Sequence, residues 1–263
     1  MKLRASQIAR EVLEAVKSPR YINFFTDLLL RLCRIDTTAG RDPKEASPQE
    51  SLCLGLIAQE ASKYLPSEAS FFKPPIDSRI FALKEFTKPP APFSPQEYFQ
   101  ERCNLVIKVP GSENIGIPMV YNAHIDTVAP YFPPHKSGFW IYGRGSVDDK
   151  AQVALLIASM KLLCEIERKY RIRVRAPRIY QFVIEEETGG NGTLSALLDE
   201  ELRSFSALVL EPTSLRIHPA NRGAVWYQAE LRREHPKINF AELAAFVILE
   251  LEKEGALIKE ESD

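Results

Sequence analysis

A histidine and an aspartate stand two residues apart, at His124 and Asp126, directly after the apolar run 118–123. An imidazole binds a divalent metal through one ring nitrogen, while its other N–H donates to a carboxylate that fixes the tautomer. The pair therefore suits a metal site. However, His-x-Asp also arises by chance, and a single histidine is most often only hydrogen-bonded. Other residues have to decide between these interpretations.

Carboxylates follow two further apolar runs and one glycine-bearing turn downstream of that pair. They are Glu185, Glu186, Glu187 and Glu211 after the runs, and Asp148 at the turn. In an open α/β sheet, side chains placed just beyond the carboxyl ends of the strands converge, so we expect these groups to meet. Together with a histidine they form a nitrogen and oxygen ligand set that suits Zn²⁺, Mn²⁺ or Co²⁺.

Each acid also has an ordinary structural interpretation. Three consecutive glutamates are typical of a solvated turn, and Glu211 before Pro212 is compatible with a plain strand end. Asp148-Asp149 suits the first turn of a helix, where carboxylates interact favourably with the macrodipole. These interpretations explain each acid separately but do not predict that all of them follow strand ends.

The elements that would position these groups alternate in type from residue 104 onward. Short β-branched and aliphatic runs alternate with longer helical patterns, which is typical of an α/β fold with a mostly parallel sheet flanked by helices. The predicted strands are 105–109, 118–123, 179–184 and 207–210, and the predicted helices between them are about 149–170 and 194–205.

The residues before this region predict helices and one irregular segment. Apolar spacing over 1–35 predicts two helices with a break near Ser18-Pro19. A third helix is predicted from Ser47, which can act as its cap, to about Tyr64. The many prolines of 73–97 predict an irregular excursion over the surface.

The composition describes a folded chain without a charge bias. The 263 residues are 45% hydrophobic, and 34 basic residues balance 35 acidic ones. This balance favours a small-molecule or peptide partner and argues against nucleic acid or an anionic membrane. No apolar run suits a signal peptide or a bilayer span. Four scattered cysteines without a C-x-x-C pair indicate a reducing compartment, so we expect a cytoplasmic protein. They are Cys33, Cys53, Cys103 and Cys164.

Five motifs between about residues 104 and 226 resemble, in the same order, those of the M20-type metallopeptidases and amidohydrolases. The motifs are AHIDTV, GRGSVDDK, EEETGGNG, LEPT and NRGAVW. The family includes aminoacylases, glutamate carboxypeptidases, acetylornithine deacetylase and succinyl-diaminopimelate desuccinylase. The resemblance implies the N-terminal part of a zinc-peptidase-like catalytic, metal-binding domain over 1–219 and the start of a small α+β lid or dimerisation domain over 220–263. A homodimer through that lid is a further expectation.

The resemblance also implies the ligands of a two-metal site. His124 and Glu211 would bind the first metal, Glu187 the second, and Asp148 would bridge the two. Zinc is the expected metal, and Co²⁺ and Mn²⁺ share this ligand set.

The resemblance further implies the residues that act on the reaction. Glu186 would be the general base that takes a proton from the activated water, and Asp126 would orient the imidazole. The triple acid leaves the register open, and the family places its glutamate pair two residues before a glycine, here Gly189. The expected activity is hydrolysis of an amide bond in a peptide or an N-acyl amino acid.

Arg222 and His235 resemble residues that contact substrate at the entry to the lid. His235 is equally compatible with an exposed histidine in a charged run. The family pattern continues past the lid and adds a histidine ligand to the second metal, which predicts a C-terminally truncated chain with an incomplete second site. Two hypotheses follow. One is a fragment of an M20-type hydrolase, and the other is a catalytically impaired remnant that binds only a metal or a partner.

Overall fold

The computed structural model describes residues 5–113, 115–199, 205–219, 230–232 and 239–262. The chain divides into two compact units, Met1–Leu215 and Arg216–Asp263.

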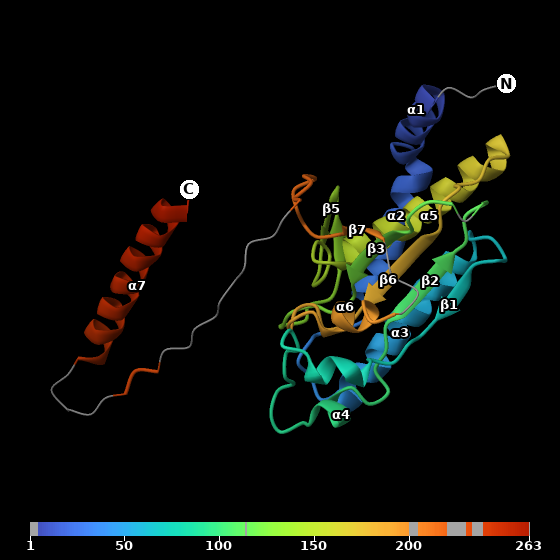
Figure 1. Ribbon diagram of the computed structural model, residues 1–263. Coiled ribbons are helices and arrows are strands. Elements are labelled where there is room, and N and C mark those ends of the chain that lie inside the picture. Colours follow the sequence, from blue (N-terminus) through green and yellow to red (C-terminus); the bar gives the residue numbers. More distant parts are fainter. Residues whose placement is uncertain (1–4, 114, 200–204, 220–229, 233–238, 263) are drawn as a thin grey trace. The chain divides into compact units, whose positions relative to one another are not determined.

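A five-stranded sheet with the order β1-β2-β6-β3-β7 lies in the first unit (Figure 1). Its strands are β1 (Ser70–Phe72), β2 (Leu105–Val109), β3 (Met119–His124), β6 (Arg178–Val183) and β7 (Ser206–Val209). β3 pairs in parallel with β6 and β7, whereas β2 is antiparallel to both of its neighbours. The predicted α/β class is confirmed, and the reversed β2 makes the sheet mixed.

Eight helical segments and a short hairpin complete the described elements. They are α1 (Ala5–Val16), α2 (Pro19–Cys33), α3 (Pro43–Ser62), the 3₁₀ segment η1 (Ser78–Ala82), α4 (Pro95–Tyr98), the hairpin β4 (His135–Ser137) and β5 (Trp140–Tyr142), α5 (Lys150–Tyr170), α6 (Asn191–Ala196) and α7 (Phe240–Ser262). α7 belongs to the second unit. None of the helices in the described ranges is long and apolar enough to cross a bilayer.

The main core forms where helices α2, α3 and α5 pack against one face of the sheet. Alternate residues of β2 and β6, among them Leu105, Ile107 and Phe182, point into it, as the two-residue period of a strand requires. The opposite face carries a small apolar cluster of Val106, Val120 and Ile179. α5 packs against β3, and a hydrogen bond from the His124 N–H to Asp149, the residue before α5, joins the start of the helix to the end of the strand.

Two helix boundaries differ from the prediction. α3 begins at Pro43, because Asp42 accepts a hydrogen bond from the Lys44 N–H and Pro43 suits the first turn. This is the same cap-and-proline signal as Ser47-Pro48, five residues earlier. The hydroxyl of Ser47 instead donates to the Glu101 carbonyl. α6 runs from Asn191 to Ala196. It starts three residues before the predicted helix 194–205 and also ends before the predicted end.

The proline-rich segment has the irregular backbone expected of it, with only η1 and α4 as short helical turns. It is not confined to the surface, however. Ile76 and Ile80 are buried, and the residues that follow α4 continue inward with Phe99 and Arg102. This part of the chain therefore belongs to the core, beside the turn formed by Glu185, Glu186 and Glu187, here called the acidic turn.

Candidate metal centre

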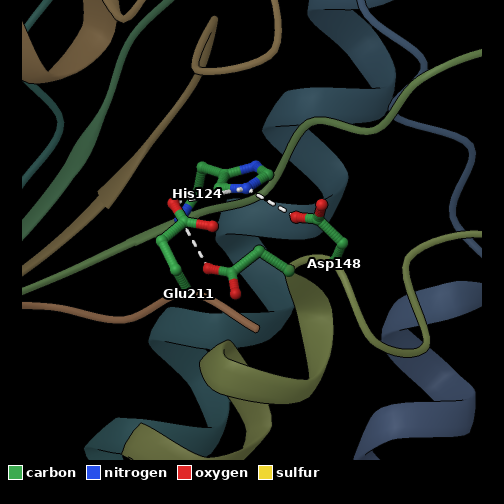
Figure 2. Close-up of side chains that lie close together, drawn as sticks. His124, Asp148 and Glu211 are labelled. Carbon is green, nitrogen blue, oxygen red and sulfur yellow. Dashed lines mark hydrogen bonds and ion pairs between the residues drawn. The ribbon is translucent and has the colours of Figure 1, made fainter. Parts of the chain in front are cut away.

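His124 ends β3, and its imidazole lies beside the carboxylates of Asp148 and Glu211 (Figure 2). Its Nε2 lies 3.0 Å from Asp148 Oδ1, 3.8 Å from Glu186 Oε2 and 3.9 Å from Glu211 Oε1. The histidine is 1% exposed. β2, whose carboxyl end lies at the opposite edge of the sheet, is the one predicted strand that neither a histidine nor an acid directly follows. The convergence expected from the parallel strands is therefore present.

Asp126 holds the imidazole from its other side. His124 Nδ1 lies 3.0 Å from the backbone oxygen of Asp126 and 3.4 Å from its Oδ1. The same carboxylate accepts the backbone N–H groups of Glu186 at 3.2 Å and Glu187 at 3.0 Å. One buried aspartate thus fixes both the ring and the acidic turn.

The loop after α2 supports the segment that follows His124. Thr37 Oγ1 donates to the Ile125 carbonyl, and the Thr127 N–H donates to the Thr37 carbonyl. Lys150, at the start of α5, is buried and donates to the Ile35 carbonyl at 2.6 Å. These bonds tie α2, β3 and α5 together beneath the centre.

Asp149 is a member of the cluster that the sequence did not single out. It is fully buried, and its Oδ2 accepts the backbone N–H of His124 at 3.1 Å. Its Oδ1 has no hydrogen-bond partner in the described structure. Ligand atoms of His124, Asp148, Asp149 and Glu211 all lie within 4.8 Å of one another. The only signal in the sequence was the doubled aspartate, which also suits a helix start.

Burial, and to a smaller extent the repulsion between neighbouring carboxylates, raises the pKa values of the acids in the cluster. Burial, with the charges of Glu186 and Asp148, raises the pKa of Glu211 to about 7, although His124 opposes the shift. Burial also raises the pKa values of Glu186 and Glu187, and it raises that of Asp149 to about 9.

The pKa of the imidazole is also raised, but for a different reason. Burial by itself lowers the pKa of His124, but the hydrogen bond to Asp126 and the surrounding negative charges more than offset it and raise the pKa to about 10. The site therefore contains more carboxyl groups than its one imidazole can pair with. A divalent cation fits this donor set, and the unpartnered Asp149 oxygen is a further sign of it.

The acidic turn separates its three glutamates. Glu185 is buried and directed away from His124, toward Tyr98, Arg102 and Thr188. Glu186 has an exposed side chain that reaches the imidazole. Glu187 lies outside the four-residue cluster within the described structure, and its raised pKa reflects burial and the charge of Asp148.

The remaining predicted site residues, Arg222 and His235, lie outside the described residues.

Residues 120–258 match the sequence model described as "Peptidase family M20/M25/M40". The match covers more than half of the 263 residues. The chain belongs to the M20/M25/M40 peptidase family.

Individual M20 relatives agree with this assignment. A Pyrobaculum aerophilum protein assigned as a LysW-lysine/LysW-ornithine hydrolase is 34% identical over 146 residues, which cover 54% of this chain and 39% of the relative. An M20 domain-containing protein of Sordaria macrospora is 32% identical over 153 residues, covering 50% and 33%. The chain thus spans between a third and two fifths of the length of these two relatives.

The fold has a counterpart among solved structures. Human carnosine dipeptidase 1 aligns with 73% of this chain and 39% of its own, with a TM-score of 0.53 and 12% sequence identity. At this identity the likeness concerns the fold alone. It agrees with the mixed sheet and its flanking helices.

Proposed function

We propose that the protein is a metal-dependent hydrolase of amide or peptide bonds. The observation that carries the proposal is the cluster around His124, in which donor atoms of Asp148, Asp149 and Glu211 lie within 4.8 Å of one another. The cluster stands at the carboxyl edge of the parallel strands, where α/β enzymes bind ligands. The family assignment supports hydrolysis. A remnant that only binds a metal or a partner is not favoured.

The donor set supports specific ligand roles. His124, Asp148 and Glu211 would hold one metal, and Asp148 with Glu187 would hold a second. One imidazole among carboxylates suits Zn²⁺, and Co²⁺ and Mn²⁺ accept the same ligands. When bound, such a metal lowers the pKa of water from about 16 toward 7 and polarises a carbonyl oxygen.

The chain's own side chains supply the proton transfers and the positioning. Glu186 is exposed and 3.8 Å from the imidazole, so a water and a substrate can reach it. Burial raises the pKa of Glu186 toward neutral pH, where a general base is most effective. Glu186 takes a proton from water and returns it to the leaving nitrogen. Asp126 keeps both the imidazole and the turn in place.

The substrate class follows from the family rather than from a pocket. A peptide or an N-acyl amino acid is the proposed substrate, and a relative assigned as a LysW-lysine/LysW-ornithine hydrolase supports this class of bond. Arg222 and His235 remain the proposed substrate contacts.

The domain division and the setting complete the proposal. Residues 1–219 would belong to the catalytic domain, and 220–263 would begin a lid through which a homodimer forms. The compact units Met1–Leu215 and Arg216–Asp263 support a boundary in this region. The cytoplasm is the proposed compartment, supported by four cysteines that form no disulfide.

A hydrolysis assay tests the proposal. We expect protein loaded with Zn²⁺, Co²⁺ or Mn²⁺ to release free amine from a panel of dipeptides and N-acyl amino acids. Removing the metal with a chelator should abolish the release, and adding the metal back should restore it. Rates that are the same with and without metal would contradict a metal-dependent reaction.

A further inference from the structure

A buried arginine lies beneath the turn that carries Glu186 and Glu187. The Nε and Nη2 atoms of Arg102 donate to the two carboxylate oxygens of Glu50 on α3, at 2.9 and 2.5 Å. The same Nη2 donates to Glu185 Oε1 at 2.5 Å. The arginine side chain is 1% exposed. One cation therefore links α3 to the first residue of the acidic turn.

Glu185 is held through both of its side-chain oxygens. Besides Arg102, the Tyr98 hydroxyl donates to Oε1 at 3.1 Å, and the Thr188 hydroxyl donates to Oε2 at 2.6 Å. The backbone of Glu185 has a φ of 62°, in the left-handed region that is unfavourable for a residue with a Cβ atom. Such a conformation persists where its surroundings determine it. The shape of the turn thus depends on the partners of this side chain.

The next two residues of the turn are fixed from the metal side. The backbone N–H groups of Glu186 and Glu187 donate to the Asp126 carboxylate, which also faces the His124 ring. A displacement of Glu185 would therefore move the two following carboxylates relative to the imidazole.

The proline-rich segment also contacts the far end of the turn. The N–H and carbonyl of Thr87 pair with the side-chain amide of Asn191, at 3.1 and 2.9 Å. Gly189, with a φ of 123°, lies so close that a Cβ atom there would stand 2.0 Å from Thr87 Oγ1. Thr87 within this segment and Arg102 shortly after it thus hold the turn at its two ends.

Burying an arginine between two carboxylates costs desolvation free energy, and apolar side chains of similar volume often stabilise a fold equally well. What the guanidinium adds is direction, because its planar fork fixes the angle and distance of each carboxylate. Here the paired bonds to Glu50 orient the guanidinium, and its Nη2 in turn holds Glu185.

We propose that Arg102 is a positioning residue of the metal centre. Through Glu185 it sets where the carboxylates of Glu186 and Glu187 stand relative to His124. The inference rests on the proposed function, which makes Glu186 the base and Glu187 a metal ligand.

Amide hydrogen exchange of the metal-free 263-residue protein tests the positioning directly. Arg102→Lys keeps the positive charge but loses the fork. We expect exchange of the Glu186 and Glu187 amides to accelerate about tenfold, while amides within β3 and β6 keep their rates. Arg178→Lys is the matched control, because Arg178 is also buried and pairs with Glu167, but at the opposite end of β6. This control should leave the turn unchanged.

An unchanged turn in Arg102→Lys, or an equal acceleration throughout the sheet, would overturn the proposal and leave Arg102 a general stabiliser. If Arg102→Lys does not fold, Tyr98→Phe removes one donor to Glu185 and keeps every charge paired. It should accelerate the same two amides about threefold and no others. Unchanged exchange of these amides in Tyr98→Phe would then count against the proposal.

Zinc titration separates this inference from the proposed function. We expect Arg102→Lys to weaken zinc binding about tenfold, as is typical when a residue behind a ligand is changed, and Arg178→Lys to leave it unchanged. Equal affinity in Arg102→Lys and the unmodified protein would overturn the effect on the centre. If the unmodified protein binds no zinc, the proposed function fails, whereas the exchange experiment still decides whether Arg102 positions the turn.

Discussion

Glu186→Gln is expected to lower the turnover of metal-loaded protein by about a hundred- to ten-thousandfold, the range that general base catalysis contributes. Glutamine has nearly the same shape but accepts no proton from water at neutral pH. Metal binding should persist, because the His124, Asp148, Asp149 and Glu211 cluster stays intact. The measurement is the initial rate on the best substrate of the panel, with metal content determined on the same sample.

Glu45→Gln is the matched control for this variant, since Glu45 is an exposed glutamate in the first turn of α3. It should keep the full rate. Glu186→Asp should recover only part of the lost rate, because the shorter side chain retains a base but withdraws it from the site. Full activity in Glu186→Gln would remove Glu186 as the base and reopen the register of the three glutamates.

His124→Ala is expected to weaken zinc binding by more than about a hundredfold. Changing a residue behind a metal ligand already costs ten- to a hundredfold, and His124 is the only imidazole in the described cluster. Turnover should be lost with the metal. Calorimetric titration of metal-free protein with zinc measures the affinity, and circular dichroism monitors the fold.

His135→Ala supplies the comparison for that variant. His135 is an exposed histidine that stacks on Tyr142 in the β4–β5 hairpin, with a ring separation of 4.9 Å. Its removal should leave zinc affinity unchanged. Were His135→Ala to lower the affinity as much as His124→Ala, the site would not be centred on β3.

The location of the centre could be predicted from the sequence because strand ends carry positional information. His124, Glu186 and Glu211 each follow an apolar run, and parallel strands bring their carboxyl ends to one edge. Neither the reversed direction of β2 nor the start of α3 was predicted. The sequence of Leu105–Val109 has the same alternation in either direction, and Asp42-Pro43 and Ser47-Pro48 offer the same helix signal.

The residues that support the centre escaped prediction because their environment is created by distant parts of the chain. Arg102 follows a glutamate in a polar stretch, yet its partners are 52 and 83 residues away. In the sequence Asp149 is typical of a helix start, whereas in the structure the packing of α5 on β3 buries it beside His124. Short-range sequence patterns predict strand ends and candidate metal ligands. They do not predict the burial of a charged residue, which depends on contacts between elements far apart in the sequence.

The most direct test of the metal centre is X-ray absorption at the zinc edge of protein loaded with one equivalent of Zn²⁺. The structure predicts oxygen and nitrogen ligands at about 2.0–2.2 Å, with the multiple scattering of a single imidazole. Sulfur at about 2.3 Å would place the zinc on cysteine instead, and a shell of water alone would show no site at all. Either result would contradict a centre built from His124, Asp148 and Glu211.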